Sequence, residues 1–237
     1  MKKAVLLLYL VFPLGTAFSQ QIHVPKNFAL IEKISGDLDK DGINELVMAF
    51  DIQKVEKEVP NEEKEPSEEN EDVFEGVPRE LRIYKKKDKQ WVLWQKSNQA
   101  LFGSRDGGMM GDPFEEMKIE NGVLLISQSG GSSWKWSQTD KYRYQDGEFL
   151  LIGYTSTAGK ICEYWKNVDF NLLSGKMIVE MEYENCEEEN PTQEAFKSEN
   201  ETIYKKGIKI TLKERRAKEI KITTPKYKHE IYIATTE

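Results

Sequence analysis

The segment Gly36-Asp37-Leu38-Asp39-Lys40-Asp41-Gly42-Ile43-Asn44-Glu45-Leu46 has the layout of a calcium-binding loop. Aspartates at alternate positions can direct three carboxylates at one point, and a glycine follows them where the chain must bend sharply. The carbonyl oxygen of the next residue and a glutamate at the ninth position can complete the set. Hard oxygen ligands of this kind suit Ca²⁺, whereas soft metals require Cys or His. The sequence therefore predicts a Ca²⁺ site whose ligands are Asp37, Asp39, Asp41, Ile43 and Glu45.

The residues on either side of this loop favour strands over helices. Residues 29–31 and 46–50 are short apolar runs without helical periodicity. The twelfth position of the loop, where a helix-loop-helix calcium site carries a bidentate glutamate, is Met48. We therefore expect a calcium loop between two strands. The alternative is an Asp- and Gly-rich hairpin turn that binds no ion.

The pattern Gly-Asp-x-Asp-x-Asp-Gly-x-x-Glu-Leu followed by an apolar strand resembles the calcium loop of FG-GAP and VCBS-type repeats. The resemblance covers about residues 28–50 and occurs once, whereas a propeller needs about four to eight blades. The repeats usually carry Asp at the ninth position, where this chain has Glu45. The resemblance implies calcium binding and an extracytoplasmic β-structure, and it implies no catalytic activity.

The N-terminus is typical of a secretory signal peptide. Lys2 and Lys3 precede an apolar run over residues 4–12, and small residues lead to a cleavage site near Ser19–Gln20. We therefore expect residues 1–19 to be removed and residues 20–237 to form a single secreted or periplasmic domain. No later segment is long and apolar enough to predict a membrane span.

Composition excludes one class of partner. The net charge is −7, and it becomes −9 once Lys2 and Lys3 are removed. Nucleic-acid binding needs clustered Lys and Arg, so we expect no nucleic-acid partner. Export also makes calcium plausible, because extracellular sites operate with Kd of about 10⁻⁴ to 10⁻³ M.

The two cysteines, Cys162 and Cys186, belong to a chain predicted to be exported, where disulfides persist. A hairpin pattern lies between them, with a turn at Ser174-Gly175. If Asn171 pairs with Lys176, Cys162 lies opposite residue 185, which is one step from Cys186. We therefore expect a disulfide across the base of this hairpin; the alternative is two separate buried thiols.

The remaining sequence predicts an all-β fold with one acidic insertion. Residues 52–78 form an acidic loop whose charge run, 56–75, has too few apolar residues to order itself. Elsewhere, short alternating runs are separated by turn signals such as Asn121-Gly122 and Asp146-Gly147. We expect an antiparallel meander of hairpins arranged as a partial propeller, a sandwich or a barrel.

Two further features of the sequence are candidate ligand sites. Trp134 and Trp136 follow a glycine pair and could form a sugar-stacking platform, although tryptophans at strand spacing are more often part of a core. Residues 103–112 form a glycine-rich loop that could contact a ligand or a second cation.

We do not expect an enzyme. His23 and His229 are the only histidines, and the chain has no nucleophile elbow, zinc signature or nucleotide loop. The predicted function is therefore an exported, calcium-stabilised interaction or ligand-binding module with an unknown protein or glycan partner. The alternative is a secreted carbohydrate-active hydrolase that uses an Asp/Glu pair.

Overall fold

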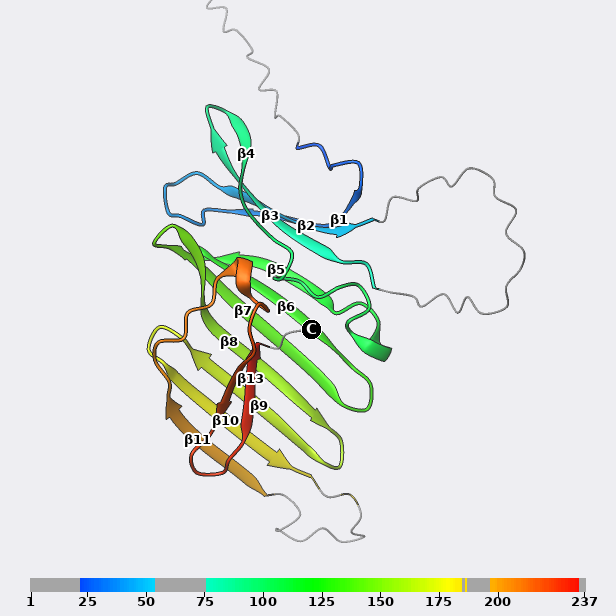
Figure 1. The fold of residues 1–237 in the computed structure, drawn as a ribbon, viewed down its shortest axis with the longest axis vertical. Helices are drawn as coiled ribbons and strands as arrows, with labels where there is room; N and C mark the ends of the chain where they lie inside the picture. The colour runs from blue at the N-terminus through cyan, green and yellow to red at the C-terminus, as the bar shows by residue number, and fades with distance from the viewer. Residues whose placement is uncertain (1–21, 54–75, 185, 187–196, 235–237) are drawn as a thin grey trace, which may run out of the picture.

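The computed structural model describes residues 22–53, 76–184, 186 and 197–234, and over these residues the fold is antiparallel and almost entirely β (Figure 1). The predicted all-β meander of hairpins is thus confirmed. The predicted signal peptide, residues 1–19, and the charge run, residues 56–75, lie outside the described residues. Among the described residues, no helix has the length and apolar character needed to cross a membrane.

Two open sheets and one two-stranded ribbon make up the fold. The small sheet has the order β1-β2-β3-β4, with bounds Phe28–Gly36, Glu45–Ile52, Arg79–Lys87 and Gln90–Ser97. The large sheet has the order β11-β10-β9-β8-β7-β6-β5. The bounds of β5 to β11, in that numerical order, are Phe114–Glu120, Val123–Gly131, Lys135–Gln145, Glu148–Lys160, Tyr164–Asn171, Lys176–Tyr183 and Ser198–Tyr204. The ribbon pairs β12 (Ile220–Thr223) with β13 (Glu230–Ala234), and the two 3-10 helices are η1 (Gly108–Met110) and η3 (Leu212–Glu214).

Neighbouring strands of both sheets follow one another in the chain, and tight turns join several of these pairs. Asn121 and Gly122 both have positive φ, 53° and 77°, and so do Asp146 and Gly147, 53° and 84°. Two consecutive positive-φ residues define the turn whose twist matches that of the flanking strands, which explains why Asn-Gly and Asp-Gly predict hairpins correctly here.

One continuous core joins the small sheet, the large sheet and the ribbon. Each strand of the large sheet turns alternate side chains, such as Leu124, Ile126 and Tyr142, to this core. The ribbon and η3 cross the same face of the large sheet, and Ile231 and Ile233 pack into the core from there (Figure 1). The large sheet therefore has one covered face, and its other side chains point away from the core.

An ion pair buried in the core connects the ribbon to the large sheet. Arg215, just after η3, donates from Nε and Nη2 to the Asp140 carboxylate on β7 at 2.6 and 3.0 Å. Its Nη1 donates to the carbonyl of Ile233 on β13 at 2.6 Å, and the Tyr142 hydroxyl donates to Asp140 at 3.1 Å. The two charged side chains are only 3% and 0% exposed. Because its charges and donors are matched within the core, this network can fix the ribbon against β7.

The predicted disulfide is also confirmed. Cys162 and Cys186 are bonded, with their Cα atoms 5.1 Å apart, and Asn171 pairs with Lys176 as the hairpin register requires. The bridge closes the β8–β9 turn onto the chain that follows β10. It lies at the opposite end of β9 from the Ser174-Gly175 turn.

We predict that Asp140→Asn lowers the free energy of unfolding by about 3 kcal/mol, because it leaves the Arg215 charge buried without a countercharge. Urea unfolding followed by circular dichroism measures this. Glu148→Gln is the matched control, since the Glu148–Lys209 pair is exposed and its loss should cost less than about 1 kcal/mol. Equal effects of the two substitutions would contradict the role assigned to the buried pair.

Candidate metal centre

The predicted calcium loop occupies residues 37–44, between β1 and β2. The pair Gly36↔Glu45 closes it, and it bends back at Gly42, where φ is +85°. Glycine adopts this conformation without steric cost. Leu38, 1% exposed, points into the core and fixes one side of the loop. The expected bend at the glycine is therefore present.

Hydrogen bonds within the loop orient its carboxylates. The amide of Gly42 donates to Asp37 Oδ2 at 2.9 Å, and the amide of Leu38 donates to Glu45 Oε2 at 2.7 Å. The amide of Ile43 donates to Asp41 Oδ1 at 2.8 Å. One oxygen of each of these carboxylates is held by a backbone amide, which leaves the second oxygen of Asp37 and of Glu45 available for another partner.

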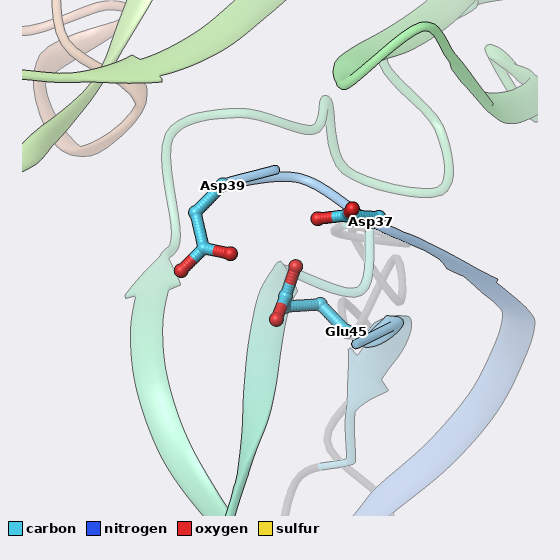
Figure 2. Close-up of side chains that lie close together, drawn as sticks. All are labelled: Asp37, Asp39 and Glu45. Carbon is cyan, nitrogen blue, oxygen red and sulfur yellow. The ribbon is translucent and has the colours of Figure 1, made fainter. Parts of the chain in front are cut away.

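Three of the five expected ligands converge. Asp37, Asp39 and Glu45 each have a carboxylate oxygen within 4.8 Å of those of the other two (Figure 2). Oxygens bound to one Ca²⁺ at 2.3–2.6 Å lie at most about 5 Å from one another, so this spacing fits a shared cation. Asp41 is not part of this group; its Oδ2 lies 2.8 Å from the Lys85 ammonium, which also contacts Asp39, and Ile43 is 46% exposed.

Glu45 provides an independent indication of a missing partner. Its side chain is fully buried, and its Oε1 makes no hydrogen bond, as is also true of the buried Oδ1 of Asp37. Burial raises the pKa of Glu45, opposed mainly by the hydrogen bond from Leu38. An unpaired buried carboxylate oxygen is unfavourable by several kcal/mol in general. A cation between Asp37, Asp39 and Glu45 would supply the partner that both oxygens lack.

Lys85 lies at the candidate site, which the sequence did not reveal. Its ammonium contacts Asp39 Oδ2 and lies 2.8 Å from Asp41 Oδ2. It lowers the pKa of Asp41 by a direct hydrogen bond, and the two aspartates raise its own pKa. Lys85 follows Tyr84, the partner of Leu46 in the β2–β3 ladder, so this pairing brings it to the mouth of the loop.

The two tryptophans of the expected platform have different neighbours. The Trp136 ring packs against Phe102 with centroids 5.2 Å apart, whereas Trp134 precedes β7 and packs against Tyr164 at 5.1 Å. Trp134 is 44% exposed, and Trp136 is partly buried. The two indoles thus lie on separate aromatic pairs rather than in one stacked surface.

The carboxylates of the glycine-rich loop are already engaged. Asp112 accepts two hydrogen bonds from the buried Arg79 guanidinium, at 2.7 and 2.5 Å, and Arg79 Nε donates to Asp51 at 2.9 Å. Asp106 accepts from the amide of Gly103 at 2.6 Å. The loop joins the large sheet through a 2.8 Å bond from the amide of Gly131 to the carbonyl of Gly107. The loop's acidic groups therefore have structural partners.

Comparison with known proteins adds no assignment: no protein-family model matches this chain, and no curated protein sequence matches it. The calcium-loop resemblance therefore depends on the residues of the loop and their geometry.

The Arg79 network generates a prediction about pH. The hydrogen bonds from Arg79 lower the pKa of Asp112, so this carboxylate stabilises the fold at neutral pH and its contribution is lost as pH falls through the lowered value. We expect Asp112→Asn to lower the free energy of unfolding by about 1 kcal/mol at pH 7, discounted because Asp112 is half exposed. Urea unfolding at pH 7 and pH 3 should give a smaller difference at pH 3; a difference that grows on acidification would contradict this account.

Proposed function

We propose that this protein is an exported β-module that binds one Ca²⁺ in the 37–45 loop and acts as an interaction or ligand-binding protein. Asp37, Asp39 and Glu45 are the carboxylate ligands, and Asp41 and the Ile43 carbonyl complete the shell when the cation is bound. The observation that carries the proposal is the buried, unpartnered oxygen of Glu45 facing two aspartates. The loop's resemblance to FG-GAP and VCBS-type repeats supports the choice of calcium.

Ca²⁺ is favoured over other cations by the donor set. All the candidate ligands are oxygens, and the loop contains neither Cys nor His, which disfavours Zn²⁺ and Cu²⁺. Mg²⁺ demands near-ideal octahedral geometry and retains several waters. A buried carboxylate such as Glu45 offers little room for that hydration shell.

Export is supported by the signal-peptide pattern at residues 1–19 and by the Cys162–Cys186 disulfide. Disulfides form and persist mainly in oxidising compartments. Secreted and periplasmic locations are both compatible with these two features.

The alternative of a hydrolase required two carboxylates in an aromatic cleft near Trp134 and Asp112. Asp112 binds Arg79, and Trp134 packs on Tyr164. No observation at that location favours catalysis, so we do not propose it.

The first test is thermal unfolding with Ca²⁺ and with a chelator. If Kd is about 10⁻⁴ M, 10 mM Ca²⁺ gives about 2.7 kcal/mol of stabilisation, which raises Tm by roughly 5–10 °C. Isothermal titration calorimetry should give about one site per chain, and Mg²⁺ should have a smaller effect.

Glu45→Gln is the matched variant for this test. The amide keeps the size of the side chain and can still accept from Leu38, but it removes the buried charge. We expect it to abolish the Ca²⁺ response while leaving the chelated protein at least as stable as the wild type. The proposal fails if wild-type Tm is the same in Ca²⁺ and in chelator and no binding heat is detected.

A second prediction concerns Lys85. Its ammonium contacts Asp39 and Asp41, which are also proposed ligands of the cation. Lys85→Met should therefore strengthen Ca²⁺ binding by about tenfold, because it removes a nearby like charge whose repulsion is worth about 1–2 kcal/mol. In chelator, the same variant should be less stable than the wild type, since Asp39 and Asp41 lose their countercharge.

Lys86→Met is the control for Lys85. Lys86 lies on the same hairpin, but its ammonium lies over the Trp91 ring, 5.0 Å from the centroid. It should leave the calcium affinity nearly unchanged. Equal calorimetric affinities for the wild type and Lys85→Met would show that Lys85 does not compete for the site.

A further inference from the structure

The face of the large sheet that points away from the core carries an unusual set of side chains. On the covered face lie apolar residues such as Leu124, Ile126 and Phe170. On the opposite face, strand alternation places mainly hydroxyl, amide and carboxylate groups, with Lys135 and Lys141 on β7 and Ile178 on β10 beside them. We call the following eight residues the polar face: Ser127, Ser137, Thr139, Thr155, Thr157, Asn167, Asp169 and Glu180.

The register of the sheet aligns these residues into two rows that run across the strands. The first row is Ser127–Thr139–Thr155–Asp169, from β6 to β9. The second row is Ser137–Thr157–Asn167–Glu180, from β7 to β10. The rows are therefore adjacent, and each offers donors and acceptors at successive strands, about 5 Å apart.

Neighbouring groups within the rows are already oriented by hydrogen bonds. Ser127 Oγ and Thr139 Oγ1 are 2.9 Å apart, and Thr157 Oγ1 donates to Asn167 Oδ1 at 2.8 Å. β-Branched threonines also have few rotamers. A ligand that binds here meets side chains whose positions are largely fixed in advance, which reduces the entropy lost on binding.

The polar face is hollowed. A depression of about 340 Å³ lies over both rows, lined mainly by Thr139, Thr155, Thr157, Asn167, Asp169 and Glu180. This volume is within the range of small-ligand sites. The residues lining the depression include two carboxylates and no Lys or Arg, so an anionic ligand is disfavoured.

An aromatic ring lies beside the two rows. Trp165 is on the same face of β9 as Asn167, and it pairs with Gly159 on β8. A Cβ atom at residue 159 would lie only 2.8 Å from Cε3 of the Trp165 indole. The carbonyl oxygen of Tyr164 would lie still closer, at 2.2 Å, so the glycine lets both the β9 backbone and the indole approach β8 here. Trp165 remains partly exposed.

We propose that the polar face, together with Trp165, is a binding site for a neutral oligosaccharide or polysaccharide chain. Sugar hydroxyls both donate and accept, as do the Ser, Thr and Asn side chains, and Asp169 and Glu180 accept from hydroxyl pairs. The apolar C–H face of a pyranose ring packs against an indole. A protein partner fits less well, because the centre of a protein interface is rich in apolar and aromatic residues.

This site is separate from the calcium loop, which belongs to the small sheet. It also differs from the pair Trp134 and Trp136, because Trp136 belongs to the covered face and Trp134 to the β6–β7 turn. Failure of the glycan proposal would thus leave the calcium proposal intact, and the two can be tested on the same protein.

Affinity electrophoresis of the mature protein in native gels tests the proposal. The gels contain galactomannan, xyloglucan, hydroxyethyl cellulose or dextran as neutral probes, with alginate as an anionic comparison. At least one neutral polysaccharide should retard the wild-type protein. Thr157→Val and Asn167→Ala should each weaken that binding roughly three- to tenfold, the effect of losing one net hydrogen bond. Trp165→Ala should weaken it about tenfold or more.

Two control variants separate this face from others. Tyr232→Ala removes an exposed aromatic ring from the ribbon on the other side of the large sheet and should leave binding unchanged. Trp134→Ala should also leave it unchanged. Thr157→Val retains the shape and the strand preference of threonine, so it tests binding even if Trp165→Ala is poorly folded. Thermal unfolding verifies the fold of each variant.

Three outcomes would overturn the proposal. The first is that none of the four neutral polysaccharides retards the wild type. The second is that only alginate does so. The third is that Trp134→Ala abolishes binding while Thr157→Val and Asn167→Ala do not, which would move the site to the β6–β7 turn.

Discussion

The buried Arg215–Asp140 pair ties the ribbon to the face of the large sheet whose apolar side chains form the core. Without a matched partner, neither charge could remain in the core, and the pair therefore requires η3, β7 and β13 to meet at one place. Fixing the ribbon there gives the inward side chains of β6 to β10 their apolar cover. It also leaves the opposite face of the same strands free, which is why Thr157 and Asn167 have no ribbon above them. Strand alternation puts the polar residues on that uncovered face, and the ion pair keeps the ribbon on the other one.

The calcium loop involves a different balance of charge. Asp37, Asp39, Asp41 and Glu45 lie within nine residues, and Glu45 is fully buried, so their mutual repulsion needs a cation. Lys85 supplies one positive charge to Asp39 and Asp41, but it leaves Glu45 Oε1 without a partner. A divalent ion would satisfy the inner oxygens that a lysine at the mouth does not reach. In the proposed site, the loop would remain folded without metal and gain stability when Ca²⁺ binds.

Local patterns predicted the hairpins, and long-range pairing explains what they missed. Asn121-Gly122 and Asp146-Gly147 determine their turns by backbone preference alone, and the Asn171–Lys176 register followed from one such turn. The role of Lys85 depends on the pairing of β2 with β3, whose connection spans the acidic segment, so no spacing rule could reveal it. Trp165 was missed for the same reason: it matters only beside Gly159, on another strand. Trp134 and Trp136 are only two positions apart in the sequence, although they lie on separate aromatic pairs.

The calcium loop also lies where the two sheets meet. A Cβ atom added at Gly36 would lie 2.6 Å from the Ile119 side chain of β5. A Cβ atom added at Gly122, in the β5–β6 turn, would lie 3.4 Å from the carbonyl oxygen of Asp37. The loop is therefore packed against the β5–β6 hairpin, whose strand β6 begins the polar face. A cation that fixes Asp37 and Glu45 relative to each other would also fix the small sheet against this edge of the large one. In the proposed arrangement calcium would not need to contact a ligand of the polar face, because it would act on the large sheet through the contact between the two sheets.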